Sequence, residues 1–176
     1  MTTSDEALAR AAAAGDAQAF SALISRHYDR VFRFAFRLTG SRADAEDLTQ
    51  DICAQLPAKI GHFRADARFT TWLYRVVMNA AHDQRRRRAT HEKAAENWGE
   101  VEQARRAEVA ETSEALDWLT QAMRTLSEDL RDTLALVLDD MTHAETAAVL
   151  GISEGTVSWR ISEAKKRLKA MKETFA

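Results

Sequence analysis

The sequence predicts an all-α protein in which two small helical domains are joined by an acidic linker. One proline and six glycines in 176 residues leave few turn signals between segments rich in helix-forming residues. Apolar residues recur at helical spacing along most of the chain, and hydrophobic residues make up 45% of it, enough for two small cores. Start and stop signals then place the helices one after another.

Two helices are predicted within the first 40 residues. Ser4 is expected to cap a short alanine-rich helix that stops at Gly15. Asp16 is expected to cap a long helix that ends at Thr39 and Gly40. The apolar side of this long helix is predicted to hold Phe20, Leu23, Ile24, Tyr28, Val31, Phe32, Ala35 and Leu38.

Two further helices complete the first predicted domain. Ser41 is expected to cap the third helix, which reaches Pro57, where the missing amide donor is expected to kink or end it. The fourth helix is predicted from about Arg68 to Arg88, after a connection over residues 61–67. Its buried positions are expected to be Trp72, Leu73, Val76, Val77 and Ala80.

An acidic segment separates the two predicted domains. Residues 1–90 carry 14 Lys and Arg against 10 Asp and Glu, whereas residues 91–116 carry 3 against 7, so the formal net charge of −2 hides a basic first domain. From residue 91 to residue 112 the apolar residues also thin out, and this segment is predicted to be a linker that is helical only in places. The two domains are then residues 1–90 and 113–176.

Two more helices are predicted at the start of the second domain, and a helix-turn-helix follows them. Thr142 and Glu145 form a capping box at the start of its first helix. Gly151 supplies the positive φ of a tight turn, and the small Ala147 lets the second helix cross close by. Val157 is expected to fill the angle between the two helices.

The second helix of this unit is the one that can enter the major groove of DNA. Ser153 is expected to cap it, and apolar residues repeat at helical spacing along its buried side. Two ordinary packed helices would explain this buried stripe but not the Ala-Gly-Val spacing across the turn. The outward side chains are expected to be Glu154, Ser158, Trp159, Ser162 and Glu163, with a basic tail of Lys165, Lys166, Arg167 and Lys169.

Five segments, taken in order, resemble parts of one known family. They are Gly15-Asp-Ala-Gln-Ala-Phe20, Asp44-Ala-Glu-Asp-Leu-Thr-Gln-Asp51, residues 63–75, Leu126-Ser-Glu-Asp-Leu-Arg131 and the helix-turn-helix over residues 142–161. Their joint order and spacing resemble the extracytoplasmic function (ECF) group of sigma-70 family sigma factors of bacterial RNA polymerase. The resemblance covers nearly the whole chain apart from the linker.

The resemblance implies that the third predicted helix binds the clamp of the largest subunit of core RNA polymerase. It also implies that the protein contacts the flap region of the polymerase. Acidic and amide side chains surround apolar residues on this helix, a composition expected of a docking surface. An ordinary solvated helix with a buried stripe is the alternative. The residues expected to bind core polymerase are Asp44, Glu46, Asp47, Leu48, Gln50 and Asp51.

The resemblance also implies that the fourth predicted helix and the loop before it read and melt the minus-ten element. An aromatic ring and polar groups can enclose an unstacked base while arginines hold phosphates. A plain interhelical loop with Phe63 packed inside is the alternative, and Trp72 is expected in the core. The residues expected to contact minus-ten DNA are Phe63, Arg64, Asp66, Arg68, Thr71, Arg75, Asn79, Arg85 and Arg86.

By the same resemblance, the helix-turn-helix reads the minus-thirty-five element. The family usually has basic residues at the positions of Ser158 and Glu163 and a small polar residue at that of Trp159, so this face is less basic than usual. Pro57 also stands where many relatives carry an aromatic residue. The residues expected to contact minus-thirty-five DNA are Thr156, Ser158, Trp159, Arg160, Ser162, Lys165 and Lys166.

The expected function is that of an alternative sigma factor whose partners are core RNA polymerase, promoter DNA and an anti-sigma factor. No phosphate loop, nucleophile pattern or metal-ligand spacing stands out, so neither an enzyme nor a cofactor is expected. A single cysteine and the lack of a long apolar run predict a cytoplasmic protein without membrane insertion. Two alternatives stay open: a dimeric helix-turn-helix repressor, and a sigma-like decoy that binds an anti-sigma factor.

Overall fold

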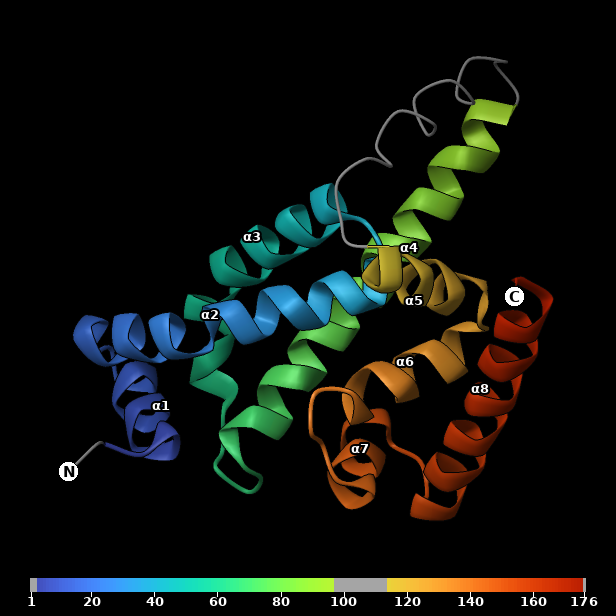
Figure 1. Cartoon of the computed structure of the whole chain (residues 1–176). Helices are drawn as coiled ribbons and strands as arrows, with labels where there is room; N and C mark the ends of the chain where they lie inside the picture. Colours follow the sequence, from blue (N-terminus) through green and yellow to red (C-terminus); the bar gives the residue numbers. More distant parts are fainter. Residues whose placement is uncertain (1–2, 97–113, 176) are drawn as a thin grey trace.

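The structure is a computed structural model, and it describes residues 3–96 and 114–175. These residues form eight α-helices and one 3-10 turn and contain no strand, which confirms the all-α prediction. Four helices precede the undescribed segment and four follow it, and the two groups pack against each other (Figure 1). Within the described residues, no helix is both long and apolar enough to cross a bilayer.

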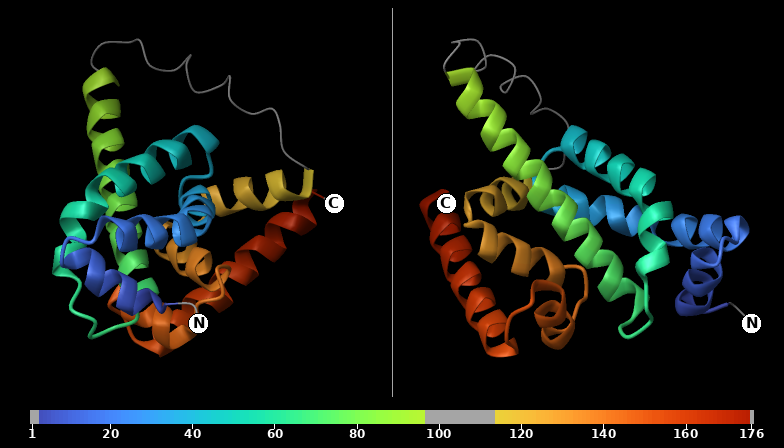
Figure 2. Two further views of the ribbon diagram at one scale, coloured as in Figure 1. Left: turned by 90° about the vertical axis from the view of Figure 1, so that its left-hand side faces the viewer. Right: turned by 180° about the vertical axis from the view of Figure 1, so that it is seen from behind.

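The first group consists of α1 (Asp5–Ala13), α2 (Ala17–Thr39), α3 (Arg42–Lys59), the 3-10 turn η1 (Ile60–His62) and α4 (Phe69–Glu96). The predicted caps are confirmed, because the side chains of Ser4, Asp16 and Ser41 each accept a hydrogen bond from a first-turn amide. Helices α2 and α3 lie side by side, and α4 crosses them (Figure 2). Their shared core is built from Leu23, Phe34, Leu48, Ile52, Leu56, Phe69 and Val77.

Two helix ends differ from the sequence prediction. Pro57 lies inside α3, which continues for two residues before η1. The proline sits in the last turn, where its missing amide costs one hydrogen bond, while the buried Leu56 and Ile60 hold this segment on the core. Helix α4 continues past Arg88 into the segment expected to be the linker, because the residues that follow are mostly helix formers. The rest of that segment, residues 97–113, lies outside the described part of the chain.

The second group consists of α5 (Glu114–Thr125), α6 (Glu128–Val137), α7 (His143–Leu150) and α8 (Glu154–Phe175). Helices α7 and α8 form the predicted helix-turn-helix, with the capping box of Thr142 and Glu145 at its start and a φ of 67° at Gly151. Val157 is fully buried where the helices meet. Ser153 Oγ accepts a hydrogen bond from a first-turn amide of α8 at 3.1 Å, so the predicted cap is confirmed.

The two groups of helices contact each other along α2 and α4. Helix α6 packs against α2, and α7 packs against α4 (Figures 1 and 2). This arrangement brings the first turn of the helix-turn-helix close to the residues of α4 that were expected to contact DNA.

Candidate nucleic-acid and polymerase interfaces

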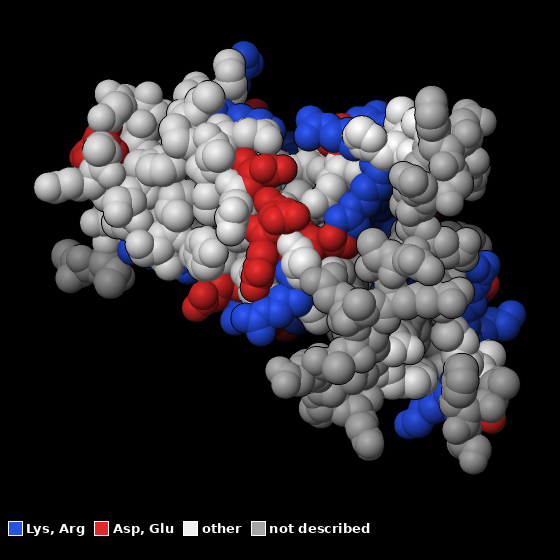
Figure 3. Space-filling model, turned by 90° about the horizontal axis from the view of Figure 1, so that it is seen from above, with Lys and Arg blue, Asp and Glu red and all other residues white. Residues whose placement is uncertain are grey.

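The outer face of α3 presents polar side chains to solvent. Glu46, Asp47, Gln50 and Asp51 are exposed, and Figure 3 shows acidic side chains gathered on the face that carries this helix. Leu48 is different, because its side chain is 1% exposed and lies in the core. The four polar residues therefore share one surface that a partner can reach, whereas the expectation that Leu48 contacts polymerase is corrected to a core role.

Asp44, the remaining member of the predicted polymerase-binding set, is held by an arginine of α4. The Arg88 guanidinium donates two hydrogen bonds to the Asp44 carboxylate, and this hydrogen bonding raises the pKa of Arg88. The pair ties the first turn of α3 to α4. Asp44 thus lies beside the polar face of α3 and also helps to hold that face in place.

The loop between η1 and α4 departs from its expected role at Phe63. The Phe63 side chain is 7% exposed, and its ring centroid lies 5.7 Å from the rings of both Phe69 and Trp72. An apolar ring is stabilised more by such a cluster than by exposure to water. The expectation that Phe63 contacts a base is therefore corrected to a core role in this structure, while Arg64 and Asp66 on the same loop are exposed.

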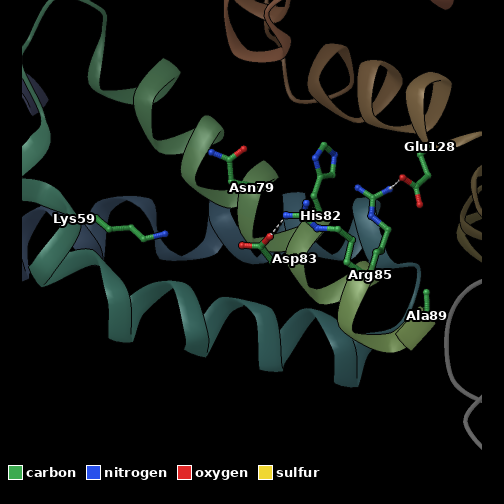
Figure 4. A pocket seen from close by; sticks show the side chains of 8 residues that line it. Lys59, Asn79, His82, Asp83, Arg85, Ala89 and Glu128 are labelled. Atoms are coloured by element: carbon green, nitrogen blue, oxygen red, sulfur yellow. Dashed lines mark hydrogen bonds and ion pairs between the residues drawn. The ribbon is translucent and has the colours of Figure 1, made fainter. Parts of the chain in front are cut away.

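Helix α4 exposes some of the predicted minus-ten residues and covers others. Thr71 is buried, Arg85 is partly covered, and Asn79 and Arg86 are exposed. Asn79 and Arg86 line an open hollow of about 770 Å³, drawn in Figure 4. Its walls also include Lys59, His82, Asp83, Arg85, Ala89 and Glu128. Basic and amide groups around one hollow suit phosphate and base-edge contacts better than an apolar ligand.

Two of the predicted minus-ten arginines contact α7. Arg68 Nη1 donates a hydrogen bond to Glu145 Oε1 at 3.0 Å. Arg75 donates from Nε and Nη2 to the carbonyl oxygen of Ala148, at 2.9 and 2.6 Å. Both arginines are exposed, yet each is hydrogen-bonded to the helix-turn-helix.

A buried carboxylate of α6 meets α4 at the same interface. The residue is Asp132, which is 3% exposed. Its Oδ1 accepts a hydrogen bond from Arg85 Nη2 at 3.0 Å, and its Oδ2 lies 2.7 Å from His82 Nε2. A third predicted minus-ten arginine is thus engaged by the second group of helices.

A second buried carboxylate, Asp139, follows the end of α6 and faces α2 and α4. Arg37 Nη1 donates to its Oδ1 at 2.6 Å, and the Tyr74 hydroxyl donates to its Oδ2. Sequence reasoning missed both carboxylates. The available signal was an acid within the apolar stripe of α6, where Asp132 falls between buried leucines.

Helix α8 presents most of its predicted face to solvent. Trp159 is 63% exposed, and Ser158, Ser162, Lys165 and Lys166 are also exposed. Thr156 is half-buried, and its hydroxyl lies 2.9 Å from Ser153 Oγ. These outward side chains lie on the helix that the helix-turn-helix geometry directs at a DNA groove.

Arg160 and Glu163 of α8 are both ion-paired. The Arg160 side chain is only 16% exposed and pairs with Asp129 of α6 at 3.1 Å. Glu163 Oε1 accepts a hydrogen bond from Arg167 Nε at 2.9 Å, so an arginine of the same helix offsets its charge. The unusual glutamate is therefore less repulsive to DNA than its position in the sequence indicates.

In residues 3–96 and 114–175, no group of three His, Cys, Asp or Glu side chains is placed to hold a metal ion. Cys53 is half-buried, and burial raises the pKa of its thiol, which opposes formation of a nucleophilic thiolate.

Comparison with known proteins places both groups of helices in one family. The family model described as Sigma-70 region 2 matches residues 23–91, and that described as Sigma-70, region 4 matches residues 116–168. The chain is 36% identical over 166 residues to the ECF RNA polymerase sigma factor SigM of Mycobacterium tuberculosis, an alignment that covers 94% of this chain and 83% of SigM. This chain belongs to the ECF subfamily of sigma-70 family sigma factors. As an ECF sigma factor it directs transcription initiation by RNA polymerase.

A further relative and two solved structures each match most of this ECF sigma factor. The ECF RNA polymerase sigma-E factor of Escherichia coli is 30% identical over 176 residues, covering 93% of this chain and 92% of the relative. The solved structure of CnrH in complex with the cytosolic domain of CnrY matches with a TM-score of 0.74 and 26% identity, over 98% of this chain and 99% of CnrH. The sigma factor RpoE of Bartonella quintana, solved with the anti-sigma factor NepR, shares the fold at a TM-score of 0.72 and 24% identity.

Proposed function

We propose that this ECF sigma factor divides promoter recognition between its two groups of helices. Residues 1–90 form the domain that binds core polymerase and opens the minus-ten element, and residues 113–176 form the domain that reads the minus-thirty-five element. The observation that carries the proposal is the exposed outward face of α8, the second helix of a helix-turn-helix with the expected capping box and turn. Residues 91–112 serve as the connection between the two domains.

The polar face of α3 is the proposed contact with core polymerase. Its support is the exposure of Glu46, Asp47, Gln50 and Asp51 on one side of a helix whose other side is fixed in the core. Charged groups on an exposed docking face steer association and set specificity. The polymerase clamp is the proposed counterpart, as the resemblance to the family implies.

The proposed minus-ten interface combines the exposed loop residues with the hollow on α4. Arg64 and Asp66 lie on the loop, and Asn79 and Arg86 lie on α4 at the hollow. Arginines suit the phosphates of a single strand, and the amide of Asn79 suits a base edge. The exposed Arg68 and Arg75 and the partly covered Arg85 extend this proposed interface toward α7 and α6.

The proposed minus-thirty-five interface is the exposed face of α8. Ser158 and Ser162 supply hydrogen-bonding groups, Trp159 supplies an apolar surface suited to a thymine methyl group, and Lys165 and Lys166 suit phosphates. This face is only weakly basic, so it depends on the polymerase-bound domain for most of its affinity.

The wider role follows from the same assignment. The protein acts with RNA polymerase in the bacterial cytoplasm, without an enzymatic centre or a cofactor of its own. An anti-sigma factor is its proposed regulator, and the similarity to CnrH, solved with the cytosolic domain of CnrY, supports such a protein partner.

Replacing Asp47 with alanine tests the polymerase-facing surface. Asp47→Ala should weaken association with purified core polymerase about tenfold, since loss of a central interface side chain typically costs about 1–2 kcal/mol. Titration of fluorescently labelled protein with core measures the effect. Asp29→Ala, an exposed acid on α2, is the matched control and should leave core affinity unchanged. Unchanged core affinity in Asp47→Ala, together with altered promoter preference, contradicts this assignment of α3.

A further inference from the structure

Trp159 projects from the outward side of α8 among small residues. It is 63% exposed. Gly155 lies about one turn before it and Ser162 about one turn after it, and neither is long enough to cover the indole. A Cβ added at Gly155 would meet only Ser153 Oγ, at 3.8 Å, so the surface beside the indole is open. Because helical side chains lean toward the N-terminus of their helix, the indole is directed toward the first turn of α8.

The hydroxyl groups next to Trp159 already have partners within the protein. The Thr156 hydroxyl lies 2.9 Å from Ser153 Oγ. Ser158 Oγ lies 3.1 Å from His143 Nδ1, at the start of α7. A hydroxyl engaged in this way must exchange or share its hydrogen bond before it contacts a base, so its net gain from DNA is small. The indole, in contrast, offers an exposed apolar surface.

The two arginines of α8 are also engaged. Arg160 is held by Asp129 of α6 at 3.1 Å, and its side chain is only 16% exposed. Successive residues of a helix are turned by about 100°, so Arg160 points to the side of α8 and not in the direction of Trp159. Arg167 donates to Glu163 of the same helix at 2.9 Å. The place of Arg160 therefore suits a phosphate better than a base edge.

This set of side chains suits thymine better than guanine. Guanine is most often recognised by an arginine or lysine that donates two hydrogen bonds to its O6 and N7 atoms. The first residues of a recognition helix contact the base edges, and residues 154–164 of α8 contain no lysine and one arginine, Arg160. The C5 methyl of thymine is an apolar group in the major groove, and a large apolar side chain gains free energy by covering it.

The charges around Trp159 indicate DNA, and not an apolar protein surface, as the occupant of this face. Lys165, Lys166 and Lys169 are all exposed on α8. Lys166 follows Trp159 by seven residues, about two turns, so the two share one side of the helix. Helix α8 also lies at the margin of the molecule in each view (Figures 1 and 2). A polyanion can therefore reach the indole and the lysines together.

We propose that Trp159 makes thymine, and not guanine, the base that specifies the minus-thirty-five element of this sigma factor. The indole packs on the methyl groups of thymines in the major groove, while Arg160 and the lysines hold phosphates on either side. The inference rests on the proposed assignment of α8 to the minus-thirty-five element and adds the base that this helix selects.

The test removes single atoms or groups from the DNA and leaves the protein unchanged. Polymerase holoenzyme is titrated into a fluorescently labelled duplex that carries the minus-thirty-five segment of a promoter whose start site has been mapped. Each thymine of this segment is replaced in turn with deoxyuridine, which lacks only the C5 methyl, and each guanine with 7-deazaguanine, which lacks the N7 acceptor. Anisotropy gives the affinity for each duplex.

At one or more thymines, the change to deoxyuridine should weaken binding about fourfold, the effect of one buried methyl group. Every guanine substitution should change affinity by less than about twofold. No effect at any thymine overturns the proposal. So does a loss at a guanine that exceeds the loss at every thymine.

Two variants assign the thymine preference to one side chain. Trp159→Ala should bind the thymine and deoxyuridine duplexes equally. Lys169→Ala is the control, because it removes an exposed cation from the same helix; it should weaken binding of both duplexes and keep the fourfold ratio. A fourfold ratio that persists in Trp159→Ala overturns the proposal.

Scrambling the whole minus-thirty-five segment separates this inference from the proposed function. Unchanged holoenzyme affinity after scrambling contradicts the assignment of α8 and overturns the inference with it. If scrambling weakens binding but wild type and Trp159→Ala show the same ratio between thymine and deoxyuridine, the assignment of α8 stands and the inference alone is overturned.

Discussion

Arg85 and Arg88 belong to one run of four arginines, yet they reach different partners in the folded chain. Arg85 donates to Asp132 of α6, and Arg88 donates to Asp44 of α3. Helical geometry turns successive side chains by about 100°, so neighbours in a run point in different directions. The run predicted phosphate contacts from composition alone. It could not show the carboxylate partners, which lie 47 and 44 residues away in the chain.

Burial divides the predicted contact residues into those that are exposed and those that lie in the core. The exposed positions on α3 and α8 could be predicted from periodicity, because polar residues alternate there with a buried stripe. Phe63 and Leu48 could not be placed so directly, since an apolar residue inside a functional motif fits both a contact and a core role. The three-ring cluster around Phe63 decides for the core in this structure.

Arg160 gives a prediction at the scale of single residues. Arg160→Ala should weaken binding of minus-thirty-five duplex DNA by polymerase holoenzyme about fivefold to tenfold, the usual range for loss of one charged DNA contact. Asp129→Ala should not weaken it, because this change frees Arg160 from its 3.1 Å ion pair. Fluorescence anisotropy with a labelled duplex measures both. Equal losses in the two variants would mean that Arg160 acts only through Asp129 and not on DNA.

At the scale of secondary structure, the caps and the interhelical turn followed from local sequence. Ser4, Asp16 and Ser41 cap as predicted because a short side chain with a free oxygen satisfies amides that no other group reaches. The ends of α3 and α4 did not follow from local sequence. Helix α3 continues past Pro57 because tertiary packing there outweighs one lost hydrogen bond. Local signals therefore placed helix starts better than helix ends.

The turn of the helix-turn-helix gives a prediction from two glycines. Gly151→Ala should lower the free energy of unfolding by about 1 kcal/mol, because Gly151 has a φ of 67° that costs an L-residue energy even though its surroundings are open. Gly155→Ala is the matched change inside α8, where an added Cβ makes only ordinary contact, and it should be stabilising by a few tenths of a kcal/mol. Urea denaturation compares the two. A destabilising Gly155→Ala, or a neutral Gly151→Ala, would contradict this account of the turn.

The capping box gives a prediction about pH. The hydrogen bond from the Thr142 amide, helped by the Thr142 hydroxyl and Arg68, lowers the pKa of Glu145 below its ordinary value in spite of partial burial. A carboxyl whose pKa is lower in the folded state binds fewer protons there than in the unfolded state. Its stabilising contribution is therefore present above the unfolded pKa, about 4.3, and is lost as the pH falls through the folded pKa.

Glu145→Gln should remove this part of the pH dependence. The difference in unfolding free energy between wild type and variant should be largest near pH 7 and should shrink as the pH falls below about 4. Urea denaturation across this range provides the measurement. A difference that is constant with pH would show that the Glu145 carboxylate contributes nothing through its charge.

At the scale of the whole molecule, the sequence predicted two helical domains but not how they meet. Periodic apolar residues specify the helices of each group, and the buried side chains of the two groups join in one hydrophobic cluster. Polar side chains far apart in sequence also join the two groups of helices, as Arg37 and Asp139 do across 102 residues. No local pattern pairs such residues, so this arrangement emerges only from the structure.

The contact between the two groups of helices also engages arginines of α4. Arg75 and Arg85 donate hydrogen bonds to α7 and α6 respectively, while the outward face of α8 is exposed.

In vitro transcription tests the central claim most directly. Purified core polymerase is incubated with genomic DNA fragments of the source organism, with and without this protein, and the 5′ ends of the RNA are mapped. The account predicts discrete start sites that appear only with the protein and share upstream sequences at the minus-ten and minus-thirty-five positions. Identical start sites with and without the protein, together with no stable association with core polymerase, would contradict it.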